Sequence, residues 1–404
     1  MTRHTLSFLI FSSLFAAAGV IRAAEPLQWK VSTTMDEQIF PSLVYAMANL
    51  KMETVTEGGR AIRRVPPDMK ALQDFAKRPL AVSFNRLAPG SKATIKVKSD
   101  SIMEPLTLIV DISRQQIIRL PIEFKYDALM EIRQSKPVNV DVSVSVDGSP
   151  FRKQTKTIVC RSVNDCPFFV VTSTKDDRGF DLGWVFAAYV NEDHPFVDQL
   201  LKEALATKIV SSFNDYQGKN EDQVWDQVRA IWTALSLRGI KYSNIVTSAN
   251  QSEIARSQHV RFLEDSVRSD QANCVDGSVL IASVLQRIGI HPELVKIPGH
   301  MFLRFWLDPE HKHWAALETT LMGAASTSLA KPTKDQAIQA AAESFRQAWT
   351  TGNSEFEKES KSIFSPPDAR YALLNIAEAR KRGIIPIPYV RPNSNSTSST
   401  SPSK

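Results

Sequence analysis

The spacing of the apolar residues changes once along this chain, and that change limits the possible folds more than any other feature. Between residues 138 and 146, polar residues alternate with Val138, Val140, Val142, Val144 and Val146. Period two places all five valines on one face of a β-strand and leaves the other face polar. From about residue 185 the apolar residues follow helical spacing instead. We therefore expect an α+β protein whose β-rich part comes first.

The β-rich part is predicted to be a module of short antiparallel strands. Asp147-Gly148 supplies a turn after the valine strand, and residues 153–159 return as its hairpin partner. Further strands are expected at residues 94–98, 106–112 and 116–124. Short strands with one apolar face each are typical of an antiparallel β-sandwich, so residues 25–180 are assigned to an immunoglobulin-like module. Nothing in this module indicates catalysis, and we expect it to support or to bind.

The helical part begins with two amphipathic helices. Their apolar stripes are Val197, Leu200, Leu201, Ala204 and Leu205 in the first helix, and Val224, Val228, Ile231, Trp232 and Leu235 in the second. Pro195 suits the first turn of one helix, and Gly239 suits the end of the other. Residues 181–385 are assigned to this second domain, with later packing helices expected at 337–349 and 369–382. Residues 386–404, rich in Ser and Thr, are expected to be a disordered tail.

The first 24 residues have the composition of a secretory signal peptide. Arg3 precedes an apolar run over residues 6–21, and Ala23-Ala24 provides small residues at the exit. An uncleaved membrane anchor is the alternative, although the run is short for a membrane span. We therefore expect an exported protein, periplasmic or secreted. No later stretch approaches about 20 apolar residues, so no transmembrane span is expected after removal of the signal.

The charge of the chain and its distribution argue against nucleic acid as a partner. The chain has 49 Lys and Arg against 43 Asp and Glu. Loss of residues 1–24 removes Arg3 and Arg22 and no acid, so the formal net charge falls from +6 to +4. Basic stripes with interleaved aromatic residues are absent from the sequence, and nucleic acid is therefore not an expected partner. The sequence gives no indication of the oligomeric state.

The chain contains only three cysteines, and two of them lie close together. Cys160 and Cys166 flank a polar, turn-like segment, and a disulfide between them is the expectation for an exported protein. Two free thiols, or a metal pair lacking its other ligands, are the alternatives. Three cysteines are too few for a four-cysteine zinc site, and His311-Lys312-His313 is expected to be an exposed turn. No metal and no cofactor are therefore expected.

The third cysteine, Cys274, has no partner in this scheme. It stands directly before an apolar run of helical spacing that ends at Gly289. The free N–H groups and the dipole at a helix start favour a thiolate over a thiol. A buried structural thiol is the alternative, because free Cys packs as a small hydrophobe. In an exported protein, a lone thiol at such a position is a candidate nucleophile.

A base and a carboxylate follow Cys274 in the sequence. A strand over residues 293–297 is followed by a Pro298-Gly299 corner, and His300 begins the next strand. A third strand, over residues 314–320, carries Glu318. A carboxylate beside a histidine holds the imidazole in one tautomer and supports its charged form. Asp276 is assigned instead to the helix dipole, because it points away from the nucleophile.

These motifs resemble the transglutaminase-like branch of the papain-like cysteine fold. The matching segments are Asn273-Cys274-Val275-Asp276-Gly277, Pro298-Gly299-His300-Met301-Phe302 and Leu317-Glu318-Thr319-Thr320. The resemblance implies helices packed on an antiparallel sheet, with a core over residues 220–325. Glu318 stands where the wider family usually has Asp. Val275 replaces the Trp that follows the nucleophile in animal transglutaminases, which leaves amide hydrolysis at least as well supported as protein crosslinking.

The resemblance and the residues together predict a cysteine peptidase, amidohydrolase or amide transferase with a Cys274-His300-Glu318 triad. Its substrate would be a protein or a peptidoglycan-type peptide. The backbone N–H of Cys274 would stabilise the oxyanion, with the side chain of Gln271 or Asn273 as a second donor. A non-catalytic binding or scaffolding protein that retains the fold is the alternative, motivated by Glu318 in the Asp position and by the large β module.

Overall fold

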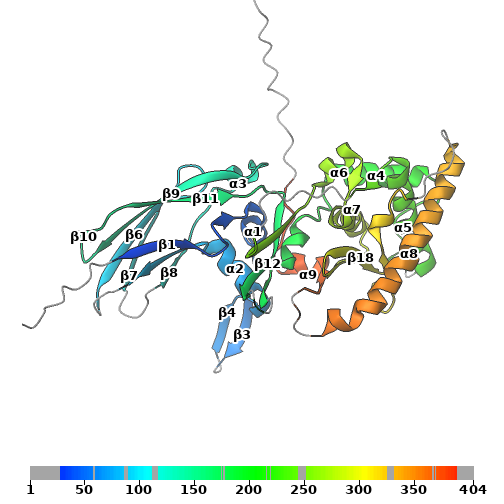
Figure 1. Ribbon diagram of the computed structural model, residues 1–404. Coiled ribbons are helices and arrows are strands. Elements are labelled where there is room, and N and C mark those ends of the chain that lie inside the picture. Colours follow the sequence, from blue (N-terminus) through cyan, green and yellow to red (C-terminus); the bar gives the residue numbers. More distant parts are fainter. Residues whose placement is uncertain are drawn as a thin grey trace, which may run out of the picture.

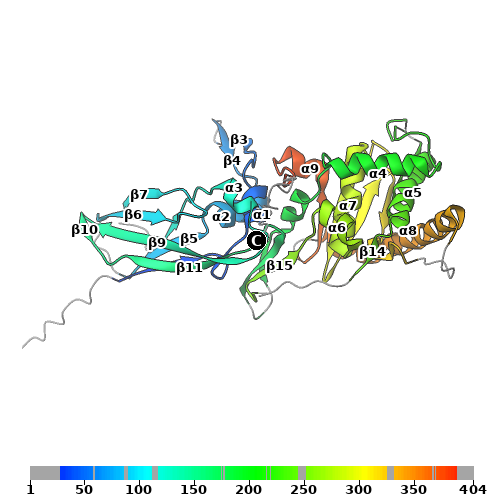
Figure 2. The same cartoon turned by 90° about the horizontal axis from the view of Figure 1, so that it is seen from above.

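The computed structural model describes residues 28–388, except for 58–59, 86–89, 112–116, 174, 176–177, 215, 219, 244–251, 325–331, 366–367 and 369. The predicted signal peptide at 1–24 and residues 389–404 of the predicted tail lie outside the described residues. The described chain is a mixed α+β protein whose sheets are mainly antiparallel. Figures 1 and 2 show a β-rich lobe at one end and a lobe of helices around a sheet at the other, with α1, α2 and β12 between them.

Two sheets form the β-rich lobe. The smaller has the order β1-β5-β8, from strands Trp29–Thr33, Leu80–Phe84 and Ile117–Leu120. The larger has the order β2-β11-β9-β6-β7, from strands Gln38–Ile39, Gln154–Cys160, Lys136–Val146, Lys92–Lys98 and Leu106–Asp111, with β10 (Ser149–Pro150) beside β9. Apolar side chains from both sheets meet in one cluster. Each sheet therefore buries one face against the other sheet.

Strand β9 follows the sequence prediction. All five of its alternating valines are buried in the cluster between the sheets. Asp147 and Gly148 both have positive φ, which a two-residue hairpin turn requires. Strand β11 pairs antiparallel with β9, and Thr157 lies opposite Asn139. Alternation and turn chemistry were thus sufficient to predict this hairpin.

Strand β12 (Asp165–Ser173) lies outside these two sheets, although the sequence placed it in the sandwich. It pairs on one side with β13 (Arg178–Asp181) and on the other with β15 (Ala255–His259). This third sheet lies in the region between the lobes (Figure 1). It therefore connects chain segments on both sides of the predicted domain boundary at residue 180.

The predicted disulfide is not present in the structure, because Cys160 and Cys166 are both free thiols. Cys160 ends β11 and packs in the core of the β-rich lobe. Cys166 lies in β12 and packs in a second apolar cluster. The segment between them is a buried polar connection, with Arg161 and Asp165 nearly inaccessible, and it carries the chain from one core to the other. Burial raises the pKa of both thiols, that of Cys160 to about 12.

The second apolar cluster is larger and begins earlier in the chain than the predicted second domain. It takes side chains from α1 (Pro41–Ala46) and α2 (Lys70–Lys77) as well as from residue 163 onward. The apolar clusters therefore place the transition between cores nearer residue 160 than residue 180. The remaining N-terminal elements are the hairpin β3–β4 (Glu53–Glu57, Arg60–Arg64), η1 (Pro67–Met69) and α3 (Tyr126–Met130).

A four-stranded antiparallel sheet organises the helical lobe, in the order β19-β18-β17-β20. Its strands are Trp314–Leu317, His300–Trp306, Pro292–Ile297 and Ala372–Asn375. Around it lie η2 (Gly183–Ala188), α4 (Pro195–Ala206), α5 (Glu221–Leu237), α6 (Leu263–Ser269), α7 (Cys274–Arg287), η3 (Thr319–Leu321), α8 (Lys334–Phe364) and α9 (Ile376–Lys381). A short parallel pair, β14 (Lys241–Tyr242) and β16 (Gln271–Ala272), completes the lobe. The helix predicted at 369–382 is instead β20 followed by α9.

Helix α8 lies directly against the edge strand β19. The backbone N–H of Ala316 donates to Asn353 Oδ1 at 2.7 Å, and that of Glu318 donates to the carbonyl of Ala348 at 2.9 Å. Gly352 permits this approach, because a Cβ at that position would meet the backbone N of Leu317 at 2.6 Å. The helix therefore supplies hydrogen bonds that a neighbouring strand would otherwise provide.

We predict that Gly352→Ala destabilises the protein, although Gly→Ala at an open helix position stabilises by about 0.5–1 kcal/mol. The added methyl group would push α8 away from β19, with an expected cost of about 1–3 kcal/mol in the free energy of unfolding. Urea denaturation measures the change. Thr350→Ala, at an exposed position of the same helix, is the matched control and should change stability by no more than about 0.5 kcal/mol. Equal stability of the two variants would contradict the close approach.

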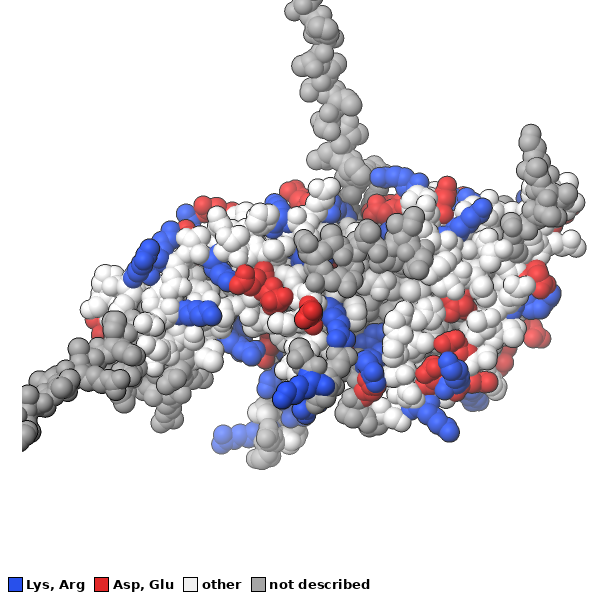
Figure 3. Space-filling view, viewed as in Figure 1, with Lys and Arg blue, Asp and Glu red and all other residues white. Residues whose placement is uncertain are grey.

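The described residues contain no helix with both the length and the apolar character that a membrane span needs. On the face drawn in Figure 3, Lys and Arg alternate with Asp and Glu over most of the surface.

Candidate active site

Helix α7 begins at Cys274, as the sequence predicts, and a capping box fixes this start. Asn273 Oδ1 accepts hydrogen bonds from the backbone N–H groups of Val275 and Asp276, both at 2.9 Å. The carboxylate of Asp276 returns to the backbone N–H of Asn273 at 3.1 Å. These reciprocal bonds define the first helical residue. Cys274 is that residue, and it is half-buried.

Asp276 is itself held by Arg261. Its carboxylate accepts the backbone N–H and the guanidinium of Arg261, each at 2.8 Å, and its side chain is fully buried. Burial raises the pKa of Asp276, while the bonds from Arg261 and Asn273 oppose that rise. The prediction that Asp276 serves the first turn of the helix is therefore confirmed.

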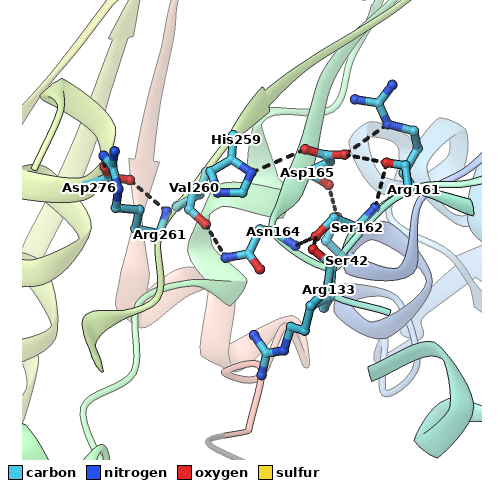
Figure 4. A network of polar contacts seen from close by, with 12 residues as sticks. Ser42, Arg133, Arg161, Ser162, Asn164, Asp165, His259, Val260, Arg261 and Asp276 are labelled. Atoms are coloured by element: carbon cyan, nitrogen blue, oxygen red, sulfur yellow. Dashed lines mark hydrogen bonds and ion pairs between the residues drawn. The ribbon is translucent and has the colours of Figure 1, made fainter. Parts of the chain in front are cut away.

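The contacts of Asp276 continue into a buried polar network between the lobes, drawn in Figure 4. Val260, next to Arg261, exchanges two 2.8 Å hydrogen bonds with Asn164. Asp165, the first residue of β12, binds Arg161 at 2.9 Å and lies 3.5 Å from His259. The start of α7 is thus connected by hydrogen bonds to the segment that links the two cores.

His300 opens β18, opposite Ile297 at the end of β17. Gly299 between them has a φ of 74°, which the tight Pro298-Gly299 corner requires. The Nε2 atom of His300 lies 2.7 Å from Glu318 Oε2. The structure therefore brings together the predicted histidine and carboxylate.

Glu318 follows β19 instead of lying within a strand. It is the N-cap of η3, and its Oε1 accepts the backbone N–H and the hydroxyl of Thr320 at 2.9 Å and 2.6 Å. One carboxylate oxygen is therefore held by Thr320, and the other is left to face His300. The extra methylene relative to Asp does not prevent contact with the imidazole.

Both the Cys274 thiol and the Glu318 carboxylate act on the His300 ring and favour its charged form. Since Glu318 occupies Nε2, Nδ1 is the ring nitrogen available to the thiol. Burial disfavours the charged ring, but the bonds to Cys274 and Glu318 and their charges outweigh burial and raise the pKa of His300 to about 10. Burial acts against the Glu318 carboxylate too, yet the bonds from His300 and Thr320 lower its pKa. The imidazolium is therefore the form present at neutral pH.

The first turn of α7 and the turn after β19 are in direct contact. Thr319 Oγ1 and Ser278 Oγ both donate to the carbonyl of Cys274, at 3.2 Å and 2.7 Å. A Cβ on Gly277 would lie 3.1 Å from the Thr319 side chain, so only a very small residue fits there. The residue after Glu318 therefore contacts the helix that carries Cys274, which fixes the distance across the site.

Of the two predicted oxyanion donors, Asn273 has its Oδ1 engaged in the helix cap. Gln271 lies in β16, three residues before Cys274, and is partly buried. Sequence reasoning missed Tyr242, which lies in β14 beside β16, with Ala272 as its register partner. Burial raises the pKa of Tyr242, and the negative charges of Cys274 and Glu318 raise it further. Its place beside the site depends on the pairing of β14 with β16, which are distant in the sequence.

A cavity of about 270 Å³ adjoins the site. It is lined by Phe168, Phe169, Phe186, Arg256, Gln258, Val275, Lys296, Ile297, Pro298, Gly299, His300, Met301 and Arg370. His300 and Val275 belong to both the site and the cavity wall. A group that entered the cavity would therefore lie beside the candidate nucleophile.

Potential metal ligands gather elsewhere, beyond the far end of β18. Ligand atoms of Glu221, Asp308 and His313 lie within 4.8 Å of one another, and His313 Nδ1 lies 2.7 Å from Glu221 Oε1. The His313 side chain is 61% exposed, in keeping with the predicted exposed turn. His311 lies 2.7 Å from His291 and stacks on Trp306. His300 begins β18 and this group lies beyond its other end, about 20 Å away at the usual rise per residue of a strand. The group of potential metal ligands therefore has no part in the site.

Comparison with known proteins finds no protein-family model and no curated protein that matches this sequence.

We predict that Glu318→Gln lowers the pKa of His300 from about 10 toward 6.5, the ordinary value for histidine. The substitution keeps the shape of the side chain but removes the negative charge that favours the imidazolium. Titration of the imidazole signals by NMR measures the change without any substrate. Glu221→Gln, which removes the carboxylate partner of His313, is the control and should leave His300 unchanged. An unchanged His300 titration in Glu318→Gln would contradict the pairing.

Proposed function

We propose that this protein is an exported, transglutaminase-like cysteine enzyme that cleaves or exchanges amide bonds of protein or cell-wall peptides. The observation that carries the proposal is the grouping of Cys274, at the start of α7, with His300 and Glu318. Glu318 lies 2.7 Å from His300 Nε2, and both Cys274 and Glu318 raise the pKa of His300. A thiol at a helix start, an imidazole and a buried carboxylate in this order are the parts of an activated cysteine nucleophile.

The fold agrees with the resemblance in the order of its parts. The nucleophile begins a buried helix, the histidine begins the next-but-one strand, and the carboxylate follows the strand after that. Helices pack around an antiparallel sheet, as expected for the papain-like fold. The proposed immunoglobulin-like sandwich for the N-terminal module is supported by two antiparallel sheets that share one apolar cluster.

In the proposed reaction His300 and Cys274 form an imidazolium–thiolate pair. The sulfur attacks the amide carbonyl carbon, and the carbonyl oxygen takes the negative charge. His300 Nδ1 then gives its proton to the departing amine as the C–N bond breaks, which leaves a thioester on Cys274. Water or a second amine attacks the thioester and gives a proton to the now neutral His300, and the C–S bond breaks to release the acid or the exchanged amide and the Cys274 thiolate. Glu318 orients the imidazole throughout and stabilises its charged form when it carries the proton.

Two donors are available to the oxyanion. The backbone N–H of Cys274 is among the free N–H groups of the first helical turn. The Tyr242 hydroxyl is the candidate for the second donor, because burial and the charges of Cys274 and Glu318 raise its pKa and keep it protonated. The helix cap uses Oδ1 of Asn273, whereas the atom that would donate to an oxyanion is Nδ2, so Asn273 also stays a candidate donor.

The test of the proposal is alkylation of the folded protein by iodoacetamide over a range of pH. Iodoacetamide reacts with the thiolate, which is the form that the proposed reaction gives to Cys274 beside a charged His300. We expect one cysteine to react below pH 7, because Cys160 and Cys166 are fully buried. His300→Ala should slow the reaction at least tenfold. Reaction only near pH 8.5, as for an ordinary thiol, would contradict the proposal.

Turnover separates catalysis from the scaffolding alternative. Cys274→Ala should abolish release of amine from peptide substrates while the circular dichroism spectrum stays unchanged. If this variant retains the full biological effect of the protein, the non-catalytic alternative holds. Incorporation of a labelled amine into peptide, compared with release of free acid, distinguishes exchange from hydrolysis.

We further predict that Tyr242→Phe lowers kcat by about 10²-fold, the typical effect of removing one oxyanion donor. KM should change little, since the hydrogen bond forms mainly in the transition state. Steady-state kinetics on a peptide substrate measure both constants. Tyr126→Phe, an exposed tyrosine on α3, is the control. An unchanged kcat in Tyr242→Phe would remove this residue from the oxyanion site.

A further inference from the structure

The cavity beside His300 has a wall that no step of the proposed reaction uses. On this wall β12 and β15 pair antiparallel, with Phe169 opposite Arg256. Successive side chains of β15 point to opposite faces of the strand. Arg256 and Gln258 line the cavity, while Ala255 and Ser257 are buried on the other face. The guanidinium carbon of Arg256 lies 5.5 Å from the centre of the Phe169 ring. The aromatic ring thus supports the cationic head at the cavity wall.

Two more basic residues line the cavity. Lys296 precedes the Pro298-Gly299 corner, and its ammonium binds Asp181 at 2.5 Å. Arg370 lies just before β20 and pairs with Asp368. Neither Asp181 nor Asp368 lines the cavity, and among the described lining residues no side chain is acidic. Lys296 and Arg370 therefore line the cavity, while these two acidic partners do not.

The rest of the lining is apolar. Phe168 stacks on Phe186 with ring centres 6.2 Å apart, and Val275, Ile297 and Met301 are buried around them. A small apolar cavity with a few convergent polar groups is the usual form of a ligand site. An occupant that matches it has an apolar stem and an anionic head. A planar guanidinium pairs best with a carboxylate or phosphate, and in a peptide the corresponding group is a carboxylate.

We propose that this cavity is a specificity subsite that binds a carboxylate-bearing residue flanking the scissile amide. Arg256 pairs with the carboxylate, and the phenylalanine wall covers the stem of the residue. The inference rests on the proposed function for the position of the amide, because His300 is shared between the cavity and the triad. It defines the substrate class as acidic peptides, which include both acidic protein segments and cell-wall peptides with free carboxylates.

The test measures binding without turnover, on the full chain carrying Cys274→Ala. Fluorescein-labelled peptides that differ only in a Glu or Gln next to the amide are titrated, and anisotropy gives each Kd. We expect the Glu peptide to bind about tenfold more tightly, and the preference to weaken in higher salt. A peptide with a γ-linked D-glutamate, tested alongside an all-L peptide, distinguishes cell-wall from protein substrates.

Two variants locate the effect. Arg256→Gln should reduce the tenfold preference for the Glu peptide to less than twofold. Gln258→Glu, which adds a negative charge beside Arg256, should reduce it independently, so that misfolding of one variant does not remove the test. Arg63→Gln, on the exposed strand β4, is the matched control and should retain the preference. Equal binding of the Glu and Gln peptides, or a preference retained in both cavity variants, would overturn the subsite.

The wild-type enzyme separates this inference from the proposed function. If the acid preference in binding depends on Arg256 but no peptide is turned over, the subsite stands and the catalytic proposal fails. If neutral and acidic peptides are cleaved at equal rates and bind equally, the catalytic proposal stands and the subsite fails.

Discussion

The capping box at the start of α7 is the constraint on which the candidate site depends most. Asn273 and Asp276 bond each other's backbone N–H groups and so define Cys274 as the first helical residue. Such a cap contributes about 1 kcal/mol to stability, but its main effect here is geometric. A shift of the helix start by one residue would move the thiol about 1.5 Å along the axis and about 100° around it. Arg261 prevents this shift, because it holds the buried carboxylate of Asp276.

The other half of the site depends on backbone contacts of the same kind. Glu318 is placed by the hydrogen bond from its own N–H to the carbonyl of Ala348 in α8, a contact that Gly352 makes possible. Thr319 then ties this turn to the first turn of α7. His300 lies between the two halves with a partner on each side. The long helix at the back of the sheet therefore determines how closely the carboxylate approaches the imidazole.

Local signals predicted the parts of the site, and only long-range pairing determined its surroundings. The helix start at Cys274 follows from the helical spacing of the apolar residues after it, and the strand start at His300 follows from the Pro298-Gly299 turn. Both signals can be read directly from the sequence. Tyr242 could not be predicted, because its position depends on a two-residue strand pairing with β16. Cys160 and Cys166 are six residues apart, but spacing alone could not show that they belong to different sheets, and the structure has both as free thiols.

The pairing of β12 with β15 has a consequence for how the two lobes work together. The sequence suggested a supporting module ending near residue 180 and a separate catalytic domain. In the structure, Phe168 and Phe169 come from the segment before that boundary and line the same cavity as His300. Asp165 in the same strand is joined through Asn164 and Val260 to the start of α7. A chain divided near residue 180 would separate one wall of the cavity from the histidine, so the segment before the boundary is part of the candidate site itself.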